Sequence, residues 1–157
     1  MDWAIQKACE LGVASITPLV TRHTVVRPSP SRQESQQRRW QRIATEAAQQ
    51  SEQWGVPRVL APCDAKEFFK RPVEGALNLI LTERYPGQSL ASVVVPQKAD
   101  TSIRIAVGPE GGWTQEELEL AINGGFSPVS MGARILRAET AAIAALSILQ
   151  SRLGELG

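Results

Sequence analysis

A glycine-rich loop near the middle of the chain has the residue types of a ligand site. It reads Gly108-Pro109-Glu110-Gly111-Gly112 and follows an apolar, β-branched run that ends at Val107. Proline disfavours helix in the residue before it, and glycine lets the backbone take positive φ and lie close to a bulky group. Thr114 and Glu117 then form the pattern of a helix capping box. Strand, glycine loop and capped helix predict a crevice at the carboxyl ends of parallel strands. The alternative is a tight turn without a ligand.

A second group of polar side chains follows the next predicted strand. This segment reads Gly132-Ala133-Arg134-Ile135-Leu136-Arg137-Ala138-Glu139-Thr140. Two arginines and a glutamate flank an apolar pair here, directly ahead of a long apolar helix.

Helices and short apolar strands alternate along the chain and must position these two segments. The predicted helices cover residues 1–11, 34–50, 64–70, 114–123 and 140–152, and the predicted strands cover 15–20, 58–60, 76–81, 103–107 and 126–131. This alternation predicts an α/β domain, a mostly parallel sheet with helices on both faces. The last helix is apolar on nearly every side, so it must be buried all round. We expect a homodimer through this helix; the alternative is a central helix of the monomer.

Composition is that of one globular domain without a membrane span. The 157 residues are 43% hydrophobic and 21% charged, and no apolar run reaches the roughly 20 residues that a span needs. Cys9 and Cys63 lie far apart and lack histidines in ligand spacing. We therefore expect no metal site and a cytoplasmic protein.

An arginine cluster stands out against a net charge of +1. Its members suit phosphate binding because the guanidinium fork matches phosphate oxygens. The predicted RNA-binding residues are Arg22, Arg27, Arg38, Arg39 and Arg42. The last three fall mostly outside the apolar stripe of the predicted helix 34–50. The alternative is a solvated helix face.

The two motifs together resemble the ribosomal RNA small subunit methyltransferase E proteins of the SPOUT superfamily. The segments Gln6-Lys7-Ala8-Cys9-Glu10-Leu11-Gly12-Val13 and Trp40-Gln41-Arg42-Ile43-Ala44-Thr45-Glu46-Ala47-Ala48 are also similar to that family. The resemblance spans nearly the whole chain in the expected order.

The resemblance implies an enzyme that methylates N3 of a uridine in 16S ribosomal RNA, in the small ribosomal subunit, using S-adenosyl-L-methionine. It also implies a deep trefoil knot at the C-terminal end of the fold, although knots are rare in general. The loops implied to bind the cofactor contain Leu81, Thr82, Gly108, Pro109, Glu110, Gly111, Gly112, Met131, Gly132, Ile135 and Leu136.

Catalytic roles follow from the same resemblance. Arg137 or Arg134 is expected to stabilise negative charge on the uracil oxygens, and Glu139 or Glu110 to help the N3 proton leave. Each residue also has a structural reading, since Arg–Glu pairs often brace loops and Glu139 suits the start of a helix.

The chain is expected to form one SPOUT domain over residues 1–157, without the family's N-terminal RNA-binding barrel and without its first strand. Two alternatives follow: a fragment that binds cofactor without turnover, or a non-catalytic dimeric RNA-binding module. A third, a nucleotide-binding enzyme, is disfavoured because no lysine follows the glycine loop.

Overall fold

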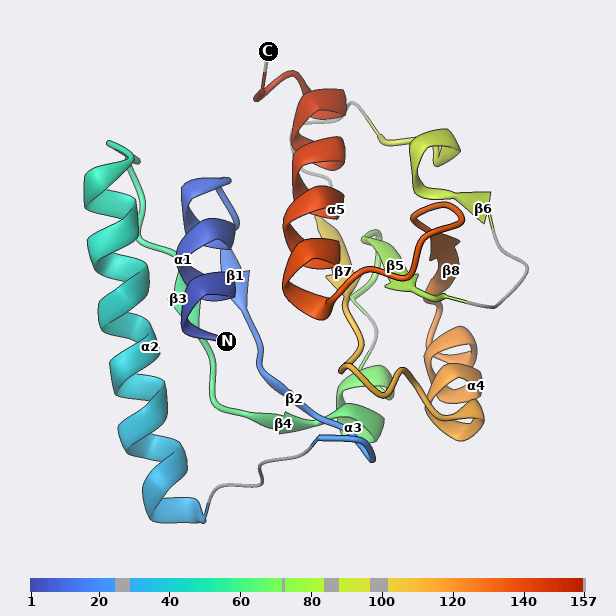
Figure 1. Cartoon of the computed structure of the whole chain (residues 1–157), viewed down its shortest axis with the longest axis horizontal. Helices are drawn as coiled ribbons and strands as arrows, with labels where there is room; N and C mark the ends of the chain where they lie inside the picture. The colour runs from blue at the N-terminus through green and yellow to red at the C-terminus, as the bar shows by residue number, and fades with distance from the viewer. Residues whose placement is uncertain (25–28, 72, 84–87, 97–101, 157) are drawn as a thin grey trace.

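The computed structural model describes residues 1–24, 29–71, 73–83, 88–96 and 102–156. Figure 1 shows the long helix α2 beside the short helix α1 on one side of the molecule, and the parallel sheet with its covering helices on the other. The elements, in chain order, are α1 (Asp2–Glu10), β1 (Ser15–Ile16), β2 (Leu19–Val20), α2 (Pro30–Gln50), β3 (Arg58–Val59), β4 (Cys63–Asp64), α3 (Ala65–Phe69), β5 (Leu77–Leu81), β6 (Gln88–Ser89), a 3₁₀ turn (Leu90–Ser92), β7 (Ile103–Ala106), α4 (Gln115–Asn123), β8 (Ser127–Ser130) and α5 (Ala138–Leu153).

The main sheet has four strands in the order β6-β8-β5-β7, and every neighbouring pair is parallel. Side chains of the central strand β5 enter two cores in turn, because successive side chains of a strand point to opposite faces. Leu79 and Leu81 pack under α5 with Ala145 and Leu149. Ile80 packs on the other face, with residues of α3 and α4. The predicted α/β fold, with helices on both faces of a parallel sheet, is confirmed.

A third core lies between α1, α2 and β3. Its buried residues are Ile5, Cys9, Trp40, Ala44, Ala47 and Val59. The predicted apolar stripe of α2 is therefore confirmed. Burial raises the pKa of the Cys9 thiol to about 11, because the thiolate would have to leave water.

The predicted strand over residues 15–20 is wrong in one respect, since the chain forms two short strands there. Pro18 separates β1 from β2, and Pro62 lies between their partners β3 and β4. Proline cannot donate a backbone hydrogen bond, so each ladder is interrupted. Two helices also begin earlier than predicted, α2 at Pro30 and α5 at Ala138.

A hydrogen bond beside Gly12 joins helix α5 to the end of α1. The Gln150 side chain donates a hydrogen bond to the Leu11 carbonyl at the end of α1. Gly12 has φ +78°, and a Cβ there would lie 2.9 Å from Gln150 Nε2. The predicted helix stop at Gly12 thus serves a second purpose, because it makes room for the contact between the two ends of the chain.

Candidate functional site

Three loops leave the same edge of the main sheet. β5 lies between β7 and β8, with Ile80 opposite Ala106 and Leu81 opposite Val129. Because the three strands are parallel and in this register, the loops that begin at Thr82, after Ala106 and after Ser130 all leave from this edge. The sequence prediction that the segments 81–82, 108–112 and 131–137 come together is supported by this topology.

Trp113 fastens the glycine loop to the end of β5. Its indole Nε1–H donates to the Leu81 carbonyl oxygen at 2.9 Å. A Cβ on Gly108 would lie 3.1 Å from the same indole nitrogen. Gly108 is therefore explained in part by the close approach of Trp113, a contact that the sequence analysis did not foresee.

The loop of residues 21–24, hereafter the threonine loop, covers the other side of the glycine loop. His23 Nδ1 lies 3.0 Å from the Gly112 carbonyl oxygen. A Cβ on Gly111 would lie 2.9 Å from His23 Cβ. His23 therefore fills the space where a side chain on Gly111 would lie. Gly112, at φ +70°, has open space where a Cβ would be.

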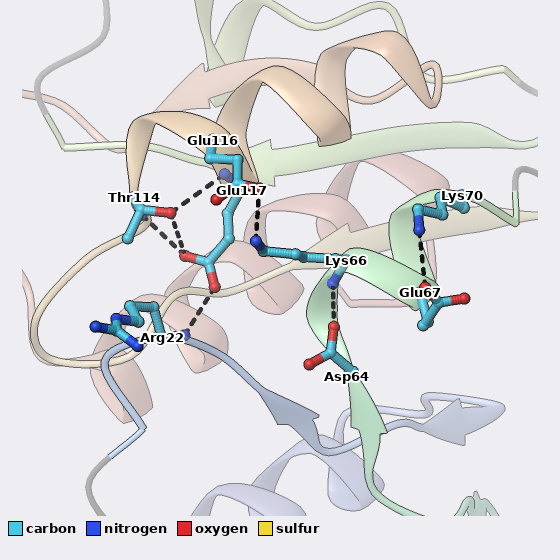
Figure 2. Close-up of polar contacts among 8 residues, drawn as sticks. All are labelled: Arg22, Asp64, Lys66, Glu67, Lys70, Thr114, Glu116 and Glu117. Carbon is cyan, nitrogen blue, oxygen red and sulfur yellow. Dashed lines mark hydrogen bonds and ion pairs between the residues drawn. The ribbon is translucent and has the colours of Figure 1, made fainter.

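Glu117 holds the threonine loop and helix α4 together (Figure 2). One carboxylate oxygen accepts a hydrogen bond from the Arg22 backbone N–H at 2.8 Å. The other accepts from the Thr114 N–H at 2.9 Å and from its hydroxyl at 3.0 Å. The capping box is confirmed, and Glu117 is only 1% exposed. A buried carboxylate is tolerated here because donors satisfy both of its oxygens.

Lys66 adds a second, exposed link beside this carboxylate, as Figure 2 shows. Its Nζ lies 2.6 Å from the Glu116 carboxylate, and its backbone N–H donates to Asp64, the N-cap of α3. The predicted cap at Asp64 is therefore confirmed. An exposed ion pair of this kind stabilises by less than about 1 kcal/mol, so Glu117 is the main fastening.

The loop after β8 presents apolar surface. Gly132 has φ +100°, a conformation that favours glycine. Ile135 is 62% exposed, and Leu136 and Met131 are half-buried. An exposed apolar residue beside a loop junction is the kind of surface that a flat, apolar ligand would cover.

Arg134 and Arg137 lie exposed on this loop, and Glu139 is half-buried in the first turn of α5. Within the described residues, none of these three side chains makes a hydrogen bond or an ion pair. The reading of them as a pair that braces the loop therefore has no contact to support it. Glu110 is exposed on the glycine loop.

Arg38, Arg39 and Arg42 of α2 are exposed to solvent, and each of these three has a carboxylate partner. Arg38 pairs with Glu34 at 3.3 Å and Arg42 with Glu46 at 3.7 Å, while Arg39 pairs with Asp2 of α1. Their charge is therefore partly balanced. Arg22 is exposed next to the glycine loop, and Arg27 lies outside the described residues.

Two further absences concern only the part of the chain that the structure describes. It holds no group of three or more His, Cys, Asp or Glu side chains placed to bind a metal ion. None of its helices combines the length and the apolar character needed to cross a membrane.

Relatives of known type match this chain over almost all of its length. A Synechocystis protein called ribosomal RNA small subunit methyltransferase E is 42% identical, and the alignment covers 95% of this chain and 48% of that protein. Its namesake from Bacillus subtilis is 31% identical, with 95% and 60% covered. The chain thus spans about half to three-fifths of these relatives.

Solved structures agree with the sequence relatives. A ribosomal RNA small subunit methyltransferase E from Neisseria gonorrhoeae, crystallised with S-adenosyl methionine, superposes with a TM-score of 0.87 at 35% identity, covering 97% of this chain and 60% of that one. A Legionella pneumophila methyltransferase with bound cofactor gives the same TM-score and identity, with 97% and 61% covered. The family described as the RNA methyltransferase domain matches residues 1–150, and the chain therefore belongs to that family.

Proposed function

We propose that this chain is the catalytic domain of an enzyme that methylates N3 of a uridine in 16S ribosomal RNA of the small subunit, with S-adenosyl-L-methionine as the methyl donor. The observation that supports the proposal is that the glycine loop and the 131–137 loop leave the same edge of the sheet, in a chain 35% identical to a methyltransferase crystallised with that cofactor. Under this proposal the protein acts in the cytoplasm, on the RNA or on small subunits, without a metal.

The residues at the edge fit the chemistry of the cofactor. Its adenosyl group is flat and largely apolar, and it would cover the exposed Ile135 with Leu136 and Met131. The Leu81 carbonyl is already bonded to Trp113, so the polar contacts would come from backbone groups at Thr82 and at the open Gly112 and Gly132. Pro109 and Glu110 stand at the exposed turn of the same loop, while Gly108 and Gly111 serve chiefly to admit Trp113 and His23.

The bound cofactor supplies an electrophilic methyl group on a sulfonium sulfur. In the proposed reaction the bond from N3 to carbon forms as the sulfur–carbon bond breaks, and the N3 proton leaves to a base. Arg137 or Arg134, exposed and without a carboxylate partner among the described residues, would stabilise the charge that develops on the uracil oxygens. Glu139, or more weakly Glu110, would receive the proton directly or through water.

Two features of assembly belong to the proposal. The C-terminal segment is proposed to thread the fold as a deep trefoil knot, as the resemblance implies. Helix α5 is proposed to form a homodimer interface, since only Ala145 and Leu149 are fully buried and its remaining apolar residues are half-buried or exposed.

Two measurements test this function. Calorimetric titration with S-adenosyl-L-methionine should give saturable binding, and its absence would favour a non-catalytic RNA-binding module. Small subunits that lack the modification should then accept labelled methyl groups, with the Arg137→Ala variant slowed roughly a hundredfold. Arg71→Ala is the matched control, because Arg71 is exposed and lies away from these loops. Binding without methylation would indicate a domain that needs the remainder of the longer relatives.

A further inference from the structure

A hollow of about 670 Å³ opens where three helices end. Its walls come from the residues that follow α1 (10–14), the residues that follow α2 (51–57) and the end of α5 with the tail behind it (150, 155 and 156). In Figure 1 the C-terminal ends of α1, α2 and α5 all lie in the upper part of the molecule. None of the loops assigned to the cofactor contributes to the hollow.

The electrostatic character of this hollow is negative. A helix C-terminus carries a partial negative charge from its aligned peptide dipoles, and three such ends converge here. Glu52 and Glu155 line the hollow and make no ion pair with any described residue, while Glu10 pairs with Lys7 at 2.8 Å. Among the residues that the structure describes, no lysine or arginine lines it.

The rim is aromatic and apolar. Trp54 is fully exposed, Val56 is 49% exposed and Leu156 is 41% exposed. Neighbouring exposed apolar side chains commonly mark an interaction site. The face of an indole ring attracts cations, and most strongly when the pair is shielded from water.

The floor is held by hydrogen bonds. The Gln53 side chain donates to the carbonyls of Cys9 and Glu10, and Gln150 donates to that of Leu11. These contacts join the segment after α2, the end of α1 and α5. A partner would therefore meet a site that is formed in advance, so less of the binding free energy is lost to ordering.

We propose that this hollow binds an arginine- or lysine-bearing segment of a basic protein partner. The cation would lie over the indole of Trp54 with its charge facing Glu52 and Glu155, and its aliphatic stem would pack on Val56 and Leu156. Charge complementarity selects this occupant. Nucleic acid would be repelled by the same carboxylates, and a neutral apolar segment would leave them unpaired. The proposal does not depend on methyl transfer.

A short peptide that alternates glycine and arginine is the probe, and the same peptide with citrulline in place of arginine is the control. Citrulline keeps the shape of arginine without its charge. Binding to the whole chain is followed by NMR, through the indole N–H signal of Trp54, and by fluorescence anisotropy of the labelled peptide. The arginine peptide should bind saturably, and its binding should weaken as salt is added. The citrulline peptide should bind at least about tenfold less tightly.

Variants place the binding site. Trp54→Ala should weaken binding roughly three- to thirtyfold, whereas Trp3→Ala, exposed elsewhere on α1, should leave it unchanged. Glu52→Gln combined with Glu155→Gln should weaken binding and flatten its salt dependence, and Glu74→Gln should do neither. Because the substituted residues are exposed, the variants keep the fold.

Three outcomes would overturn the proposal. The first is equal binding of the arginine and citrulline peptides, and the second is binding that Trp54→Ala leaves unchanged. The third is concentration-dependent self-association, seen by sedimentation and lost in the Glu52→Gln, Glu155→Gln variant, which would identify a second copy of the chain as the occupant. Loss of cofactor binding would bear on the proposed function alone.

Discussion

Replacing Glu117 by glutamine should separate the threonine loop from helix α4. Every polar group that faces the Glu117 carboxylate can donate: the Arg22 N–H to one oxygen, and the Thr114 N–H and hydroxyl to the other. Glutamine must turn its NH₂ group toward one of the two backbone N–H groups. Whichever orientation it takes, one buried donor then loses its acceptor.

The magnitude follows from those contacts. An unsatisfied buried donor costs about 1–3 kcal/mol, and the hydrogen bonds that remain lose their ionic character, about 0.5–1 kcal/mol each. Glu117→Gln should therefore lower the free energy of unfolding by about 2–4 kcal/mol. A domain of this size has about 5–15 kcal/mol in total, so the variant stays folded without denaturant.

Urea unfolding followed by tryptophan fluorescence measures the loss. Glu119→Gln is the control, because Glu119 is exposed on the same helix and, among the described residues, bonds only to Gln115; its effect should stay within about 0.5 kcal/mol. Hydrogen exchange should also show the Arg22 amide losing protection in Glu117→Gln. Equal stability of the two variants would refute the role assigned to the buried carboxylate.

Three more outcomes are expected. Trp113→Phe removes the donor to the Leu81 carbonyl, so calorimetry should show weaker S-adenosyl-L-methionine binding and urea titration a loss of about 1 kcal/mol. Gly12→Ala should lose more stability than Gly75→Ala, because both have positive φ but only the former meets a side chain; equal losses would contradict the contact with α5. Burial raises the pKa of Cys9 in the folded protein to about 11. The stabilisation linked to this shift is complete below the usual thiol pKa and is lost as pH rises toward 11. Unfolding measured over that range should show a drop of up to roughly 2–3 kcal/mol that Cys9→Ala lacks.

Sequence patterns predicted the local elements well because short-range physics determines them. The capping box at Thr114, the stripe on α2 and the stop at Gly12 all follow from spacing within a few residues. These are features that periodicity and turn chemistry specify directly. The three loops assigned to the cofactor were instead expected from the family resemblance.

Contacts between distant residues could not be predicted in this way. Glu117 was expected to cap a helix, but its second oxygen bonds to a residue 95 positions away. His23 covers Gly111 and bonds to Gly112, although 89 positions separate it from Gly112. Arg104, within an apolar strand, lies over the Phe68 ring at 4.5 Å, where burial lowers the pKa of its guanidinium. Only the folded arrangement brings these partners together.

The hydrogen bond between Gln150 and Leu11 spans 139 positions of the chain, so α1 reaches its final contacts only when α5 folds against it. While the polypeptide is being synthesised, the first helix emerges long before α5 exists to complete its end. Contacts of such long range slow folding, and the early segment has to wait in an unfinished state. Stalling synthesis just before α5 should therefore leave the amino-terminal layer open to proteases, although every residue of that layer has already been made.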